Sequence, residues 1–268
     1  MVHDFIATDD HLIFFLAPTR INVPRAIFSV GGFEQLIRWR PELGTEVIVV
    51  PIDDPSRPIR FHTDAFYQWH FTNAYARGAA GAAAPRGSVT RGGGEIVVEY
   101  VHYPDFGSFY DLASPELDRG TVSALAGARY HRAVIDPRKR TLTTEPLHDE
   151  VCEFPRVHPA VEGAPHRFAW MTLGDLAGLG RYDATTGELI QHRVGAHQRV
   201  SEPIFVPRAG ATPGDESDGH LVSLCYDGAR DESFVAVYDG RRLADGPVAR
   251  VWLGYAVPIT FHGVWVPA

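Results

Sequence analysis

The sequence predicts an all-β protein, because short apolar segments recur along the chain and glycine and proline interrupt them throughout. Val, Ile, Tyr and Phe favour strands, and runs rich in them occupy residues 45–52, 95–102, 220–226, 233–238 and 248–253. With 26 glycines and 20 prolines among 268 residues, many short strands are favoured over long helices. A weak internal repeat is the third observation.

In this repeat an apolar strand ends in an aspartate, passes through a turn and resumes as another strand. The aspartates are Asp53, Asp136, Asp183 and Asp239, and an aspartate at the head of a turn accepts hydrogen bonds from backbone N–H groups two residues further on. The last three turns recur at roughly 50-residue intervals, which is in the range of propeller blades. Four such hairpins predict about four blades, either as a four-bladed ring or as part of a larger one.

The segments between these strands are interpreted in chain order. The apolar stretch 13–30 is interpreted as a buried strand followed by a packed helix, with contact to a membrane surface as the alternative. Short helices are expected at 24–39 and 114–125, and the Gly/Ala-rich segment near 77–94 is expected to form a loop. We expect one domain over residues 1–268.

The composition of the chain argues against several classes of function. A formal net charge of -8, without a cluster of Lys and Arg, argues against a nucleic-acid partner. The two cysteines, Cys152 and Cys225, are too widely spaced for a redox or zinc motif and fit a reducing compartment. No segment approaches the roughly 20 apolar residues that span a bilayer, and the N-terminus lacks a secretory pattern, so we expect a soluble, cytoplasmic protein.

Three histidines are candidate metal ligands: His3 in MVHDF, His70 in YQWHFTNAY and His262 in TFHGVWVP. Neutral imidazole is the commonest protein ligand for transition metals, and ligands this far apart require a site assembled by the whole fold. Each has a simpler alternative. His3 would be a disordered N-terminal residue, His70 a hydrogen-bonded core histidine and His262 part of a close-packed turn. Asp4 does not suit the same ion as His3, because adjacent strand residues point to opposite faces.

Five segments, in order, resemble the successive signatures of a known family. They are MVHDFIATDDHLIFF, FYQWHFTNAYARG, CEFPRVHP, SEPIFVPRAG and VPITFHGVWVP. The family is the carotenoid cleavage oxygenases, which include apocarotenoid oxygenases, lignostilbene dioxygenases and the retinoid isomerase of the eye. The resemblance runs from His3 to the C-terminus. It implies a seven-bladed β-propeller, of which this chain would hold about the C-terminal four blades.

The resemblance also implies a non-haem Fe2+ centre held by four histidines, with three glutamates behind them. His3, His70 and His262 match the second, third and fourth histidines, and Glu153 and Glu202 match two of the glutamates. Glu153 would serve His70 and Glu202 would serve His262, since a carboxylate that accepts the outer N–H of a ligating imidazole fixes its tautomer and orientation. The first histidine and its glutamate have no counterpart in this sequence.

The function implied by the resemblance is oxidative cleavage of a conjugated C=C bond in a carotenoid, apocarotenoid or stilbene, which gives two carbonyl products. The partners would be O2 and a lipophilic conjugated substrate. A complementing N-terminal half would supply the remaining blades, and an apolar surface would contact membranes peripherally. The alternative is a catalytically incomplete propeller remnant that binds an apolar ligand or a partner chain.

Overall fold

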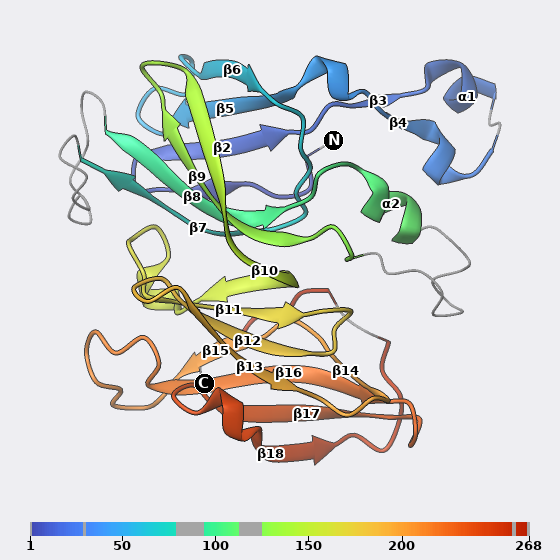
Figure 1. Ribbon diagram of the computed structural model, residues 1–268, viewed down its shortest axis with the longest axis vertical. Coiled ribbons are helices and arrows are strands. Elements are labelled where there is room, and N and C mark those ends of the chain that lie inside the picture. The colour runs from blue at the N-terminus through green and yellow to red at the C-terminus, as the bar shows by residue number, and fades with distance from the viewer. Residues whose placement is uncertain (1, 29–30, 79–93, 113–124, 259–260, 267–268) are drawn as a thin grey trace.

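The computed structural model describes residues 2–28, 31–78, 94–112, 125–258 and 261–266. Within these ranges it is built almost entirely of β-strands (Figure 1), so the all-β prediction is confirmed. The strands form a four-stranded sheet, a seven-stranded sheet, a five-stranded sheet and a two-stranded ribbon, all with antiparallel pairing.

The first sheet contains the apolar N-terminal strands. Its order is β1 (Ile6–Ala7), β2 (His11–Leu16), β5 (Thr45–Pro51) and β6 (Ile59–Thr63). Ile13 and Phe15 of β2 are buried, because alternate residues of a strand point into the core. The predicted buried strand is therefore confirmed.

The predicted packed helix at 24–39 is wrong in two respects. Only α1 (Val23–Phe28) is helical in the expected way, followed by a 3-10 turn (Phe33–Leu36) and β4 (Ile37–Trp39), which pairs with β3 (Thr19–Ile21). In addition, α1 has no buried residue, so it does not pack on the core that the chain itself provides.

A single long strand, β10 (Thr141–Val157), connects two blades. Its first part pairs with β9 from Thr141 onward, and its last part, from Cys152, pairs with β11. The seven-stranded sheet is thus two four-stranded sheets that share β10, and Figure 1 shows β10 passing from the upper to the lower half of the molecule. The other strands are β7 (Phe71–Arg77), β8 (Glu95–His102), β9 (Arg129–Asp136), β11 (Phe168–Leu173), β12 (Gly178–Asp183) and β13 (Glu188–Arg193).

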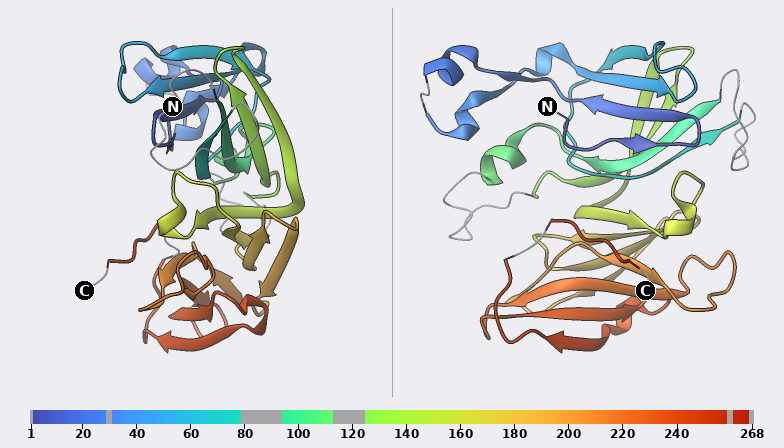
Figure 2. Two further views of the ribbon diagram at one scale, coloured as in Figure 1. Left: turned by 90° about the vertical axis from the view of Figure 1, so that its left-hand side faces the viewer. Right: turned by 180° about the vertical axis from the view of Figure 1, so that it is seen from behind.

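The last sheet is also effectively four strands wide. Its strands are β14 (Gln198–Val200), β15 (Ile204–Pro207), β16 (Gly219–Asp227), β17 (Glu232–Asp239) and β18 (Pro247–Trp252). Both β14 and β15 pair with β16, which pairs in turn with β17, and β17 pairs with β18. The described residues therefore form four four-stranded sheets, which confirms the prediction of about four blades, and Figure 2 shows the N-terminal and C-terminal sheets in opposite halves.

The aspartate turns have the predicted chemistry in three cases. Asp136, Asp183 and Asp239 each accept the backbone N–H two residues further on, at 3.0, 2.9 and 2.9 Å. At the first turn the neighbouring residue, Asp54, accepts a hydrogen bond from the Ser56 hydroxyl at 2.6 Å. These local bonds stabilise the hairpin turns of the blades.

Two sequence predictions fall largely outside the described residues. The expected Gly/Ala-rich loop near 77–94 is described only at its ends, and of the helix expected at 114–125 only the final residue is described. A short helix, α2 (Gly107–Leu112), precedes that segment instead. None of the described helices is both long and apolar enough to cross a membrane.

Candidate metal centre

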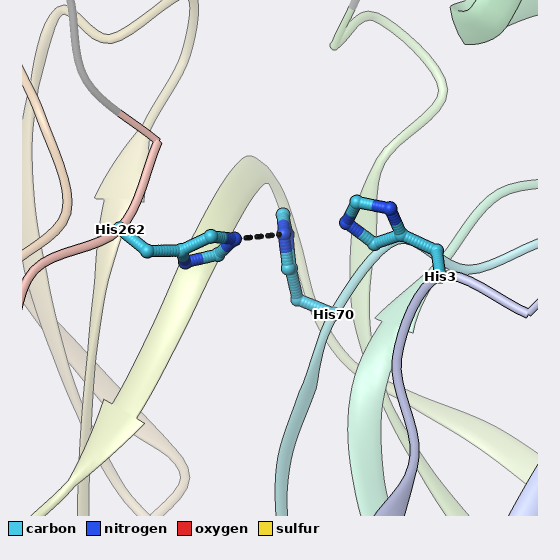
Figure 3. Close-up of side chains that lie close together, drawn as sticks. All are labelled: His3, His70 and His262. Carbon is cyan, nitrogen blue, oxygen red and sulfur yellow. Dashed lines mark hydrogen bonds between the residues drawn. The ribbon is translucent and has the colours of Figure 1, made fainter.

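Three histidines from distant parts of the chain converge on one point (Figure 3). One ring nitrogen each of His3, His70 and His262 could bind a metal ion, and these three atoms all lie within 4.8 Å of one another. Across the described parts of the chain, no other three His, Cys, Asp or Glu side chains form such a group. The fold thus assembles a cluster of potential ligands from its N-terminus, its middle and its C-terminus.

His70 is the buried member of the cluster, with 9% of its surface exposed. It directly precedes β7, and its carbonyl accepts the N–H of Val101 at 3.0 Å, which fixes its backbone against β8. Its Nδ1 lies 2.5 Å from Glu153 Oε2, and its Nε2 lies 3.2 Å from His262 Nε2. When the ring proton is on Nδ1, this nitrogen donates a hydrogen bond to the carboxylate. The other nitrogen, Nε2, then keeps a free electron pair that faces the other rings.

Glu153 occupies a distorted part of β10. The pairing of β10 with β11 changes register between Glu153 and Arg156, and Phe154 has a φ of 51°. Such bulges redirect side chains, and here the Glu153 carboxylate is directed to the histidines with 1% exposure. Besides His70, it accepts the Phe154 N–H at 2.6 Å and the Tyr103 hydroxyl at 2.8 Å.

Glu202 contacts the outer ring nitrogen of His262 as Glu153 contacts that of His70, but His262 is more exposed to solvent than His70. Its Oε1 lies 3.2 Å from His262 Nδ1, and its Oε2 accepts the Gly263 N–H at 2.9 Å. Arg156 Nε donates to Oε1 at 2.8 Å. The side chain of Glu202 is 4% exposed, whereas that of His262 is 47% exposed. The segment around His262 is therefore held chiefly by one buried carboxylate.

His3 completes the cluster from the segment before β1. Its ring packs edge-on against Trp69 and His70, with centroid separations of 4.8 and 5.3 Å. The next residue, Asp4, does not join the cluster, because its Oδ2 accepts the Phe71 N–H at 3.0 Å. That bond attaches the N-terminal segment to the start of β7 and so places His3 beside His70.

The electrostatics leave His3 available as a neutral ligand. Burial, and then the nearby charge of His70, lower the pKa of His3 below its ordinary value. For His70, burial also opposes the charged form, but the charge and hydrogen bond of Glu153 outweigh it and raise the pKa of His70. The three rings line a cavity of about 290 Å³, whose other walls include Phe154.

Two residues of this site, Arg156 and Tyr103, were not singled out by the sequence, and Asp4 was considered there only as a metal ligand and not as an anchor of the N-terminal segment. Arg156 stands in the CEFPR motif and Asp4 follows His3 directly, so both have a motif signal. Tyr103 has none, because a tyrosine at the end of an apolar strand is ordinarily a core residue. Only the fold brings its hydroxyl to Glu153.

Comparisons with known proteins agree over the full chain. The family model described as "RPE65: Retinal pigment epithelial membrane protein" matches residues 1–267. The apocarotenoid-15,15'-oxygenase of Synechocystis is 26% identical over 274 residues, covering 98% of this chain and 51% of the relative. A carotenoid cleavage oxygenase of Mycobacterium tuberculosis is 28% identical over 275 residues, covering 92% of this chain and 48% of the relative.

The solved structures show the same fold. The crystal structure of cobalt-substituted Synechocystis ACO superimposes with a TM-score of 0.82 at 24% identity, over 100% of this chain and 53% of that chain. This likeness shows the fold. The chain spans about half the length of the curated relatives that it matches.

Proposed function

Because the chain belongs to the family described as RPE65, retinal pigment epithelial membrane protein, we propose that it forms part of a non-haem Fe2+ dioxygenase that cleaves a conjugated C=C bond. The observation that carries this proposal is the convergence of His3, His70 and His262, with their ligating nitrogens within 4.8 Å. The names of the relatives, which include apocarotenoid and carotenoid cleavage oxygenases, support the class of reaction.

The three imidazoles fit a transition-metal ion in chemistry, and the pair of His70 and His262 fits one in spacing, whereas the widest separation in the cluster, up to 4.8 Å, must shorten on binding. Two imidazole nitrogens bound at about 2.1 Å to one ion lie roughly 3.0–4.2 Å apart, and the Nε2 atoms of His70 and His262 are 3.2 Å apart. Both rings are oriented by carboxylates on their outer nitrogens, as ligating histidines ordinarily are. Imidazole donors suit ferrous iron among other transition metals, so the donor set alone allows zinc, cobalt or copper as well.

The residues of this chain would hold and orient the ion, and a bound ferrous ion would supply the redox chemistry that activates dioxygen. Glu153 and Glu202 keep Nδ1 of His70 and His262 engaged, so that Nε2 of each ring faces the cavity. Phe154 packs against the rings of both histidines, at centroid separations of 5.0 and 6.0 Å.

We further propose that residues outside this sequence complete the site. His3 and His262 are exposed, and beside His262 the apolar side chains of Phe261, Val264 and Trp265 are 61%, 81% and 52% exposed. Exposed apolar groups next to a functional cluster are typical of a surface that another polypeptide covers. X-ray absorption spectroscopy of the iron-loaded chain tests this proposal, because it counts coordinated imidazoles. Three coordinated imidazoles would support completion of the site by residues outside this sequence. A fourth imidazole supplied by this chain would contradict it.

The substrate class is tested directly by turnover. The chain is prepared without oxygen, loaded with ferrous iron, and given a stilbene or an apocarotenal in the presence of O2. With the complementing half added, we expect two carbonyl products and matching O2 consumption, both abolished in His70→Ala. The competing function is a propeller remnant that binds an apolar ligand without turnover. Iron binding with no product from either substrate, even after the complementing half is added, would favour that alternative.

A peripheral membrane contact is proposed from the exposed face around α1. Ile21, Val23, Ile27 and Phe28 are between 58% and 74% exposed, and apolar side chains of this kind insert at the boundary of a bilayer. The parent chain should sediment together with phosphatidylcholine vesicles, and the Phe28→Asp variant should stay in the supernatant. Equal co-sedimentation of the two proteins would contradict the contact.

We also propose a cytoplasmic location, supported by the two cysteines being free, since oxidising compartments favour disulfides.

A further inference from the structure

The buried hydroxyl of Tyr103 reaches the carboxylate that contacts Nδ1 of His70. Tyr103 follows β8 and is 2% exposed. Its backbone forms two hydrogen bonds with Tyr67, of 2.8 and 3.0 Å, so the segments that carry Tyr103 and His70 are held together as a short two-stranded unit. Its hydroxyl donates to Glu153 Oε1 at 2.8 Å.

This hydrogen bond determines which oxygen of Glu153 faces which partner. The other oxygen, Oε2, already receives His70 Nδ1 at 2.5 Å and the Phe154 N–H at 2.6 Å. With Tyr103 present, both carboxylate oxygens are engaged and the plane of the carboxylate is fixed. Without its hydroxyl, Oε1 would be buried with no hydrogen-bond partner that the structure shows, which is costly for a charged oxygen.

We propose that Tyr103 is a positioning residue for the metal centre, because its hydroxyl holds the Glu153 carboxylate in the orientation that receives His70 Nδ1. Tyr103 itself does not line the cavity formed by the three histidines. It would act through Glu153 on His70, and a loosened carboxylate would allow the His70 ring to turn. The inference deepens the proposed function, on which its metal-binding part rests.

Tyr103→Phe tests this role because it removes only the hydroxyl. The matched control is Tyr100→Phe, since Tyr100 is fully buried in β8, just before Tyr103, and its hydroxyl bonds Thr144 at 3.0 Å, away from the cluster. Both variants lose one tyrosine hydrogen bond, but Tyr103→Phe also leaves a buried charged oxygen of Glu153 unpaired and should lose more stability than Tyr100→Phe, whose partner Thr144 is exposed. Only Tyr103→Phe should weaken binding of Fe2+, by about tenfold, at the low end of the 10–100-fold range for groups that orient metal ligands.

Two further measurements separate positioning from a structural effect. In the double variant Tyr103→Phe/Glu153→Gln, the losses of iron affinity should be less than additive, because Tyr103 acts through Glu153. Nitrogen-15 NMR of the metal-free chain, with the His70 signals assigned by comparison with His70→Ala, should show the Nδ1 proton of His70 shifted or broadened in Tyr103→Phe and unchanged in Tyr100→Phe.

The outcomes are decisive in either direction. An unchanged His70 signal and unchanged iron affinity in Tyr103→Phe would overturn the inference, as would equal losses of affinity in the two tyrosine variants. Should the parent chain bind no iron, the proposed function of this chain fails, and the NMR comparison in the metal-free protein still decides whether Tyr103 positions His70.

Discussion

Replacement of Glu153 by glutamine tests how much the buried carboxylate contributes to metal binding. The amide has nearly the same shape. Its oxygen can take the place of Oε2, which accepts the N–H groups of His70 and Phe154, and its NH2 group would face the Tyr103 hydroxyl, which can turn to accept. Glu153→Gln therefore preserves the packing and removes the negative charge from a site that is 1% exposed.

The expected loss follows from the 2.5 Å contact between Glu153 Oε2 and His70 Nδ1. Loss of such a charge-assisted partner typically weakens metal binding 10–100-fold, which corresponds to about 1.4–2.7 kcal/mol. Competition with a chromophoric chelator under anaerobic conditions measures the Fe2+ affinity. The control is Glu145→Gln, an exposed position earlier in β10. The reasoning is refuted if both variants bind iron as tightly as the parent chain.

Three further predictions concern stability and the position of His3. Burial opposes ionisation of Glu99, but His166 and Arg132 lower its pKa from 4.5 to about 2. The lowered pKa contributes roughly 3 kcal/mol to the free energy of unfolding above pH 4.5, and this contribution is lost as the pH falls through about 2. The free energy of unfolding of Glu99→Gln should therefore fall less steeply with decreasing pH than that of the parent chain. Parallel curves for the two proteins would contradict this. Trp170→Ala, at a position with 0% exposure, should cost about 3–5 kcal/mol in urea unfolding, and a loss below about 1 kcal/mol would be inconsistent with its burial. Asp4→Ala should lower iron affinity by up to about tenfold with little change in the urea midpoint, because it releases the segment of His3 from β7; unchanged affinity would count against this anchor.

The strands and the ligand histidines were predictable from local sequence. The run 95–102 coincides with β8, and 45–52 extends one residue beyond β5, because both runs are rich in β-branched residues, which favour strands. The motifs around His70 and His262 marked them as candidate ligands, and the structure brings both together with His3. That they bind a metal stays a prediction.

Features that depend on three-dimensional context were not predictable. The sharing of β10 between two sheets follows from a change of partner near Cys152, and nothing in the local pattern indicates which strand will pair there. The exposure of α1 was missed because an apolar helix normally packs on its own core. The contact of Tyr103 with Glu153 joins residues 50 positions apart, a distance at which a single sequence carries no pairing signal.

The most direct test of the metal centre is the iron content of the chain after anaerobic loading and desalting. We predict one iron per chain in the parent and in His62→Ala, an exposed histidine on β6, and none in His70→Ala. Absence of iron in the parent chain, or full retention of iron in His70→Ala, would contradict a site built on His3, His70 and His262.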